Sequence, residues 1–161
     1  MVLFYIVSLT HCRYLCLQQD VIALRKSSGT ITGEVLLNGW PQDPISFRRC
    51  SGYVEQFDVQ SPELTVRETI LFSARLRLDP ALVKTDEEKQ RFVDRTIKDM
   101  ELTDLADTLV GTDEGEGLSF EQKKRLSIAV ELAASPSVIF LDEVNKGPFL
   151  AIDVGIVSLS H

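Results

Sequence analysis

The chain has 161 residues, of which 44% are hydrophobic, so it can bury the core of about one domain. Aspartate and glutamate outnumber lysine and arginine by 24 to 17, which gives a net charge of -7 at pH 7. This acidic balance argues against a nucleic-acid backbone or an anionic membrane surface as the main partner. The three cysteines are an odd number without paired metal-ligand spacing, which argues against a disulfide framework or a zinc site and favours a reducing, cytosolic setting.

The first 17 residues form an apolar stretch that His11 and Arg13 interrupt. The stretch is too short and too charged to span a bilayer. It also lacks the basic start and the small-residue cleavage site of a secretory signal. We expect this segment to supply one buried strand, or else to be foreign to the domain that follows it.

Residues 30–37 are rich in β-branched residues and predict two short strands around Gly33. The dipeptide Asn38-Gly39, which comes next, is a strong turn signal. A further short strand is predicted within residues 50–56 and leaves a polar side chain at its exit, that of Gln56. In open α/β sheets, ligands are usually bound by residues that follow the carboxyl ends of the strands.

Consecutive helices are predicted in the middle of the chain. A threonine followed three residues later by a glutamate opens a helix over residues 66–78, and the same device opens a longer one that ends near Glu101. Two pairs of opposite charges one turn apart, Glu87/Arg91 and Asp94/Lys98, are expected on the solvent-exposed face of the longer helix. Apolar residues at helical spacing predict a shorter helix over residues 102–109. No strand pattern interrupts residues 66–110, so we expect a compact helical subdomain beside a sheet.

Residues 111–117 read as a flexible acidic loop that leads into a third capping-box pattern, formed by Ser119 and Gln122. The helix that follows is predicted to end at Ser135. A helix N-terminus that starts with an exposed serine is a natural contact for an anion. The alternative is that Ser119 is only a cap.

Residues 138–141 are apolar at every position, as expected for a parallel strand that is covered on both faces. Two adjacent carboxylates, Asp142 and Glu143, follow at its carboxyl end. One carboxylate can hold Mg²⁺ while its neighbour orients or deprotonates an attacking water, as in phosphoryl transfer. The alternative is a buried strand that simply ends in solvated acids.

The order of these features closely resembles an ABC transporter nucleotide-binding domain. In that family Gln56 would match the Q-loop glutamine, residues 118–122 the signature sequence usually written LSGGQ, and residues 138–143 the Walker B strand. The resemblance implies an α/β, P-loop NTPase-like ABC ATPase fold with an α-helical subdomain. It also implies ATP and Mg²⁺ as ligands.

The resemblance implies a role for each candidate site residue. Glu143 and Gln56 would be catalytic, and Asp142 and Gln56 would contact Mg²⁺. Ser119 and Gln122 of the signature would contact a nucleotide held by the opposite domain. The implied partners are a transmembrane domain and a second nucleotide-binding domain, with no nucleic acid, at the cytoplasmic face of a membrane. This chain itself contains no predicted membrane helix.

Longer stretches, such as SGTITGEVLLNG and GEGLSFEQKKRLSIAVELAASPSVIFLDE, resemble the second nucleotide-binding domain of a pleiotropic drug resistance transporter of the G subfamily. The likeness covers residues 20–143, with the helical subdomain over about 62–134. Residues 1–19 and 144–161 depart from the family pattern, so we expect a domain truncated at both ends. The strand 138–141 is then expected to lack neighbours on its edges, which favours low stability and aggregation.

In the family the glycine-rich P-loop comes just before residue 20. Alignment on Asp20 puts Leu15 at the position of its lysine and Cys16 at that of its metal-binding threonine. Neither side chain can replace the groups that cradle and neutralise the phosphates. We therefore expect this chain alone neither to bind ATP tightly nor to hydrolyse it, and whether the chain is an enzyme stays open.

The signature has Phe120 and Glu121 where the family has two glycines. Phe120 should crowd the approach of a phosphate, and Glu121 should add negative charge beside it. This signature would therefore serve the poorer of two composite sites in an asymmetric transporter. Two alternatives to a partial ATPase domain are a non-catalytic interaction module and a pseudogene fragment.

Overall fold

A computed structural model describes residues 5–8, 20–26, 28–37, 39–55, 60–81, 83–112 and 116–141 of the chain. The chain divides into two compact units. The first, the sheet unit, comprises residues 1–56 and 136–161, and the second, the helical unit, comprises residues 57–135.

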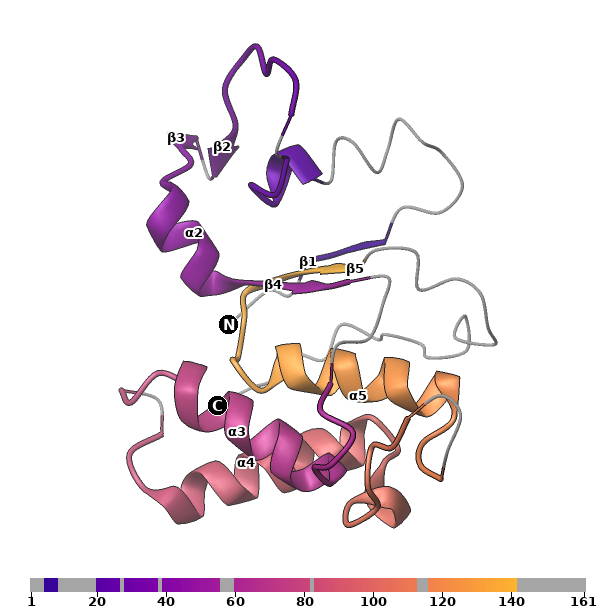
Figure 1. Ribbon diagram of the computed structural model, residues 1–161. Helices are drawn as coiled ribbons and strands as arrows, with labels where there is room; N and C mark the ends of the chain where they lie inside the picture. The colour runs from indigo at the N-terminus through magenta and orange to yellow at the C-terminus, as the bar shows by residue number, and fades with distance from the viewer. Residues whose placement is uncertain are drawn as a thin grey trace. The chain divides into compact units, whose positions relative to one another are not determined.

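The sheet unit contains a three-stranded parallel sheet with the order β1-β5-β4 (Figure 1). Its strands are β1 (Tyr5–Ser8), β4 (Ser51–Val54) and β5 (Val138–Leu141). The expectation that β5 lacks neighbours on its edges is wrong, because β1 and β4 pair with it on either side. The apolar N-terminal segment does supply a strand, and this strand fills the edge of β5 that sequence patterns could not assign.

The predicted parallel strand β5 is confirmed, and its side chains explain why the run is apolar throughout. Ile139, Phe140 and Leu141 are all buried. The Phe140 ring packs against two other rings of the sheet unit, those of Phe47 and Tyr53, each with its centroid 6.2 Å away. Burial on both faces of a parallel strand selects apolar residues at every position instead of at alternate ones.

A helix that the sequence analysis missed, α2 (Pro44–Cys50), delivers Phe47 to this core. Asp43 caps it by accepting a hydrogen bond from the Ser46 N–H at 2.8 Å. Proline at the first helical position has no N–H that would need an acceptor, and its φ suits the helix. The Asp43-Pro44 pair was therefore a readable start signal.

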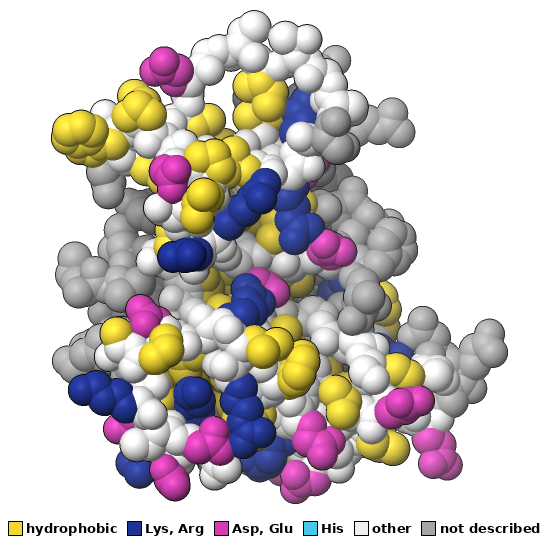
Figure 2. Space-filling model, turned by 60° about the vertical axis from the view of Figure 1, so that its left-hand side comes forward, with side chains coloured by type: hydrophobic (Ala, Val, Ile, Leu, Met, Phe, Trp, Pro, Cys, Tyr) yellow, Lys and Arg dark blue, Asp and Glu magenta, His cyan; other side chains and the backbone are white. Residues whose placement is uncertain are grey.

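The β-branched stretch before α2 contains less strand than predicted. Residues 30–35 have no regular strand structure, and only β2 (Leu36–Leu37) pairs, with β3 (Trp40–Pro41). The predicted turn between them is confirmed, with Gly39 at φ +85°. Large hydrophobic side chains lie at the surface of this region (Figure 2), among them Ile31, Leu36, Trp40 and Ile45. β-Branched residues need a neighbouring strand to favour extended pairing, and the described residues provide only the short hairpin.

The helical unit contains α3 (Val66–Arg77), α4 (Asp86–Asp99), a 3-10 turn η1 (Thr103–Leu105) and α5 (Phe120–Leu132). Their apolar faces meet in one buried core, which consists of Val66, Ile70, Ala74, Val93, Ile97, Leu102, Ala106, Val110, Leu118, Leu126, Ala129 and Ala133. The predicted long helices are confirmed, but the predicted helix over residues 102–109 is wrong beyond η1. Residues 106–108 form a turn and a bend, Leu109 forms an isolated β-bridge with Thr65, and the Val110 N–H donates to the Leu64 carbonyl at 2.9 Å.

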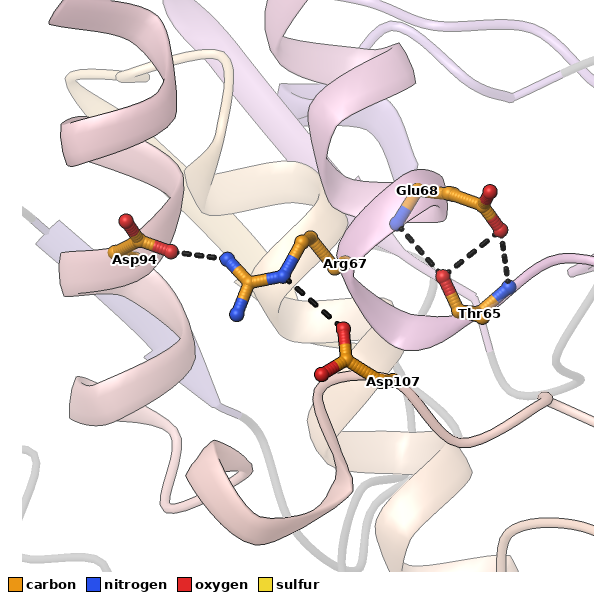
Figure 3. Close-up of polar contacts among 5 residues, drawn as sticks. All are labelled: Thr65, Arg67, Glu68, Asp94 and Asp107. Atoms are coloured by element: carbon orange, nitrogen blue, oxygen red, sulfur yellow. Dashed lines mark hydrogen bonds and ion pairs between the residues drawn. The ribbon is translucent and has the colours of Figure 1, made fainter. Parts of the chain in front are cut away.

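The start of α3 shows how local sequence defines these helices (Figure 3). The Glu68 N–H donates to the Thr65 hydroxyl at 3.2 Å, and the Glu68 carboxylate accepts from the Thr65 N–H at 2.9 Å. The hydrogen bond from the Thr65 N–H, which has the largest effect, and a second one from the Thr65 hydroxyl at 2.8 Å lower the pKa of the Glu68 carboxyl below its ordinary value of 4.5. The ionised Glu68 carboxylate therefore stabilises the fold fully at pH values above 4.5, and this contribution is lost as the pH falls through the lowered pKa of the folded state.

The charged surface of α4 differs from the prediction. Asp94 accepts a hydrogen bond from Arg67 of α3, whose Nε also lies 3.3 Å from Asp107 (Figure 3). Neither of the two pairs expected along α4 is present among the ion pairs of the described residues. Arg67 thus links α3 to α4 and to the turn after η1, which single-helix spacing does not reveal.

Replacing Thr65 by alanine should lower the free energy of unfolding by about 1 kcal/mol, because the Glu68 N–H loses its acceptor. Urea unfolding followed by circular dichroism measures the change. Thr112→Ala, at an exposed loop position, is the matched control and should change stability by less than about 0.5 kcal/mol. Equal losses in the two variants would contradict the capping role.

Candidate functional site

Three of the five predicted site residues, Gln56, Asp142 and Glu143, lie outside the described residues. The strands that precede them are described. β4 and β5 are parallel neighbours, and Val54 lies opposite Leu141 in their register. The chain therefore leaves both strands at the same edge of the sheet, which is where ligands bind in open α/β sheets.

A cluster of side chains, which sequence reasoning missed, lies at this edge. The guanidinium carbon of Arg25 lies 4.2 Å from the centroid of the Tyr53 ring, and Arg25 also forms an ion pair with Glu55. The Tyr53 hydroxyl donates to Asp20 at 3.2 Å. These contacts tie residues 20–26 to the exit of β4. Arg25 and Glu55 are 30 positions apart, so no local sequence signal could have paired them.

The other two predicted site residues, Ser119 and Gln122, form the capping box that their spacing predicted. The Gln122 N–H donates to the Ser119 hydroxyl at 3.3 Å, and the Ser119 N–H donates to the Gln122 side-chain oxygen at 2.8 Å. The main-chain N–H groups of Phe120 and Glu121 have no acceptor within the helix, because the first turn of any α-helix leaves them unpaired. The start of α5 therefore directs donors and the positive end of a helix dipole outward.

Phe120 and Glu121, which stand where the resemblance implies two glycines, are both held by residues one turn further along α5. The Lys124 ammonium nitrogen lies 5.8 Å from the centroid of the exposed Phe120 ring. The Glu121 carboxylate accepts a hydrogen bond from Arg125 at 2.8 Å. Arg125 binds a second carboxylate, that of Glu101, at 2.6 Å.

The negative charge of Glu121 is therefore paired with the guanidinium of Arg125. Partial burial of Arg125 opposes its charge, but Glu121 and Glu101 outweigh that effect and raise the pKa of its guanidinium. Sequence reasoning missed this contact, although a glutamate and an arginine four positions apart are a recognisable helical pair.

The loop before the signature is closed at its base. The Leu118 N–H donates to the Val110 carbonyl at 3.0 Å, and the backbones of Gly111 and Gly117 lie close together at this point. A Cβ atom on Gly111 would lie 2.6 Å from the Gly117 Cα. Two glycines thus allow the strands of the loop to approach closely just before Ser119.

The described residues contain no group of three or more histidine, cysteine, aspartate or glutamate side chains that could hold a metal ion. No helix within this part of the chain has both the length and the apolar composition that a membrane crossing requires.

Comparison with known proteins places these features in a family. The sequence model of the ABC transporter family matches residues 20–146. The chain is 51% identical over 128 residues to ABC transporter G family member 38 of Oryza sativa subsp. japonica, and 54% identical over 129 residues to G family member 32 of Arabidopsis thaliana. G family member 17 of Dictyostelium discoideum is 51% identical over 129 residues. Each match covers 80% of this chain, and the chain spans 8% to 9% of the length of these relatives.

Two solved structures share the fold. One, cbiO1 from Clostridium perfringens, is part of the ABC transporter complex cbiONQ and matches with a TM-score of 0.61 and 29% identity, over 87% of this chain and 53% of that one. The other, an ATP binding subunit of an ABC transporter, matches with a TM-score of 0.56 and 18% identity, over 87% and 54%. The predicted α/β P-loop NTPase-like fold is confirmed. The chain belongs to the ABC transporter family and has the fold of its ATP-binding domains.

Proposed function

We propose that residues 20–143 are part of the second nucleotide-binding domain of a G-family transporter of the pleiotropic drug resistance type, which couples ATP hydrolysis to transport through a transmembrane domain. The observation that carries this proposal is the start of α5, where Ser119 and Gln122 form a capping box within the residues that resemble the family signature. The similarity to G family members over 80% of the chain supports it. The domain would act at the cytoplasmic face of the membrane, paired with a second nucleotide-binding domain.

The proposed site divides between two places in the chain. Gln56 and Asp142 would hold Mg²⁺, and Glu143 would orient the attacking water. The donor set fits this ion, since Mg²⁺ prefers carboxylate and amide oxygens and these residues follow the neighbouring strands β4 and β5. When bound, Mg²⁺ neutralises charge on the phosphates. Ser119 and Gln122 shape the helix end that would face a nucleotide on the opposite domain.

We further propose that the polypeptide of residues 1–161 does not hydrolyse ATP by itself. No glycine in it is followed directly by a lysine, and Leu15 and Cys16 occupy the positions of the phosphate-binding lysine and threonine when the chain is aligned on Asp20. A glycine-rich backbone and a lysine ammonium supply most of the groups that hold the β- and γ-phosphates in this family of folds.

The test is phosphate release from Mg²⁺-ATP by the purified chain. We expect wild type and Glu143→Gln to release phosphate at the same background rate, because no catalytic complex forms without the loop. A rate well above background that is lost in Glu143→Gln would contradict the proposal that this polypeptide is inactive. It would also support the role proposed for Glu143.

A non-catalytic interaction module is the second candidate, and the helical unit favours it. That unit has its own buried core, and α3 carries two large hydrophobic side chains, Phe72 and Leu76, at the surface. A folded circular dichroism spectrum together with no ATP binding would favour this candidate. A chain that is unfolded in solution would instead favour a pseudogene fragment.

A further inference from the structure

The signature of this chain has an acidic side chain next to the place where a phosphate is proposed to bind. Glu121 is the second residue of α5, within the turn whose N–H groups have no partner in the helix. A carboxylate in the first turn is itself attracted to these groups and to the helix dipole. The Glu121 carboxylate therefore competes with a phosphate for these N–H groups unless another side chain holds it elsewhere.

The structure shows what holds it. Arg125 donates to the Glu121 carboxylate at 2.8 Å and to the Glu101 carboxylate at 2.6 Å, so that one guanidinium joins the first turn of α5 to the turn that follows α4. The Arg125 side chain is only 21% exposed, against 40% for Glu121 and 75% for Glu101. The contact is thus partly shielded from water. The neighbouring pair, Phe120 and Lys124, has the same one-turn spacing.

We propose that Arg125 is a positioning residue, which holds the Glu121 carboxylate along the flank of α5 and leaves the first-turn N–H groups open to a nucleotide phosphate. This inference rests on the proposed function of the signature. It changes the expectation for Glu121, because a carboxylate that is held by Arg125 neither folds over the helix end nor leaves its charge uncompensated there. Arg125 acts through Glu121 and does not itself contact the phosphate.

Four single variants of the full chain and one double variant separate positioning from a structural role. In Arg125→Gln the carboxylate is released and should compete with a phosphate. In Glu121→Gln there is no carboxylate to position, so Arg125→Gln should have no further effect on that background. Glu101→Gln removes the other partner of Arg125 and leaves the Glu121 contact in place. Arg125→Lys keeps a cation one turn from Glu121 and should preserve binding.

Inorganic tripolyphosphate is the probe, and the readout is the shift of the main-chain amide signals of Phe120 and Glu121 in two-dimensional NMR spectra. Wild type should bind the probe weakly, in the millimolar range. Arg125→Gln should bind about three- to fivefold more weakly, the ratio that corresponds to an ion pair of ordinary strength. Glu121→Gln, alone and combined with Arg125→Gln, should bind at least as well as wild type, and so should Glu101→Gln and Arg125→Lys.

Variants at two exposed positions serve as controls for the change in net charge. Arg95→Gln on α4 removes the same charge as Arg125→Gln, and Glu63→Gln matches Glu121→Gln. Equal binding of the probe by Arg125→Gln and Arg95→Gln would overturn the role of Arg125 and leave the proposed function intact. The same conclusion would follow if Glu101→Gln weakened binding as much as Arg125→Gln does. No response of these amides in wild type and in Glu121→Gln would overturn both the inference and the proposed phosphate contact. If Arg125→Gln does not fold, weakening by Arg125→Lys relative to wild type would overturn the inference.

Discussion

Leu126→Ala is expected to lower the free energy of unfolding of the helical unit by about 2–5 kcal/mol. Leu126 is 0% exposed and lies in the middle of α5, within the single core that α3, α4 and α5 share. Its removal costs the transfer free energy of the lost methyl groups and leaves a cavity that the surrounding helices fill only in part. Urea unfolding, followed by circular dichroism at 222 nm, measures the loss.

Leu76→Ala on α3 is the matched control, because the same side chain is 69% exposed there. Its effect should stay within about 0.5 kcal/mol of wild type. A loss in Leu126→Ala as small as that in Leu76→Ala would show that α5 does not pack on this core. The signature would then not be held by the helical unit.

Gly111→Ala should destabilise the loop before the signature by about 1–3 kcal/mol. Gly111 has a φ of +68°, and a Cβ atom there would lie 2.1 Å from the Glu116 carbonyl oxygen and 2.6 Å from the Gly117 Cα. Backbone atoms cannot move aside as a flexible side chain can. The base of the loop would open, and the Leu118 N–H would lose its hydrogen bond to Val110. Amide hydrogen exchange at Leu118 reports this opening directly.

Gly39→Ala controls for backbone strain alone. Its φ of +85° is also unfavourable for alanine, but no atom lies within 4 Å of the added Cβ. It should cost about 1 kcal/mol and leave exchange at Leu118 unchanged. Unchanged exchange at Leu118 in Gly111→Ala would contradict the closed base of the loop.

The sequence predicted best where the determinants of structure are local. The starts of α3, α4 and α5 each depend on a hydroxyl side chain and a partner three residues later, and all three capping boxes are present. α2 was missed although Asp43 and Pro44 provide the same kind of local signal. Capping is read within one turn and helical periodicity within a few turns of the same helix, so no tertiary information is needed to find them.

The errors arose where distant residues decide the structure. The stretch 30–35 has strand-forming residues but no partner strand among the described residues, so its propensity is not realised. The opposite error concerned β5, whose edges were expected to be bare. There β1, from the far end of the chain, pairs along its whole length. Sequence patterns show which segments can be strands, but they do not show which segments pair.

The candidate site follows the same rule. The contact between Ser119 and Gln122 was predictable from spacing, and the one between Glu121 and Arg125 could have been. The contact between Arg25 and Glu55 joins segments that only the fold brings together. The roles of Gln56, Asp142 and Glu143 stay predictions that rest on the family resemblance.

Titration of the purified chain of residues 1–161 with Mg²⁺-ATP in an isothermal calorimeter measures whether this polypeptide binds a nucleotide by itself. We predict no saturable binding in the micromolar range, because we propose that Leu15 and Cys16 stand where the family has the lysine and threonine that hold the triphosphate. Saturable micromolar binding by wild type that is lost in Asp142→Asn would contradict it.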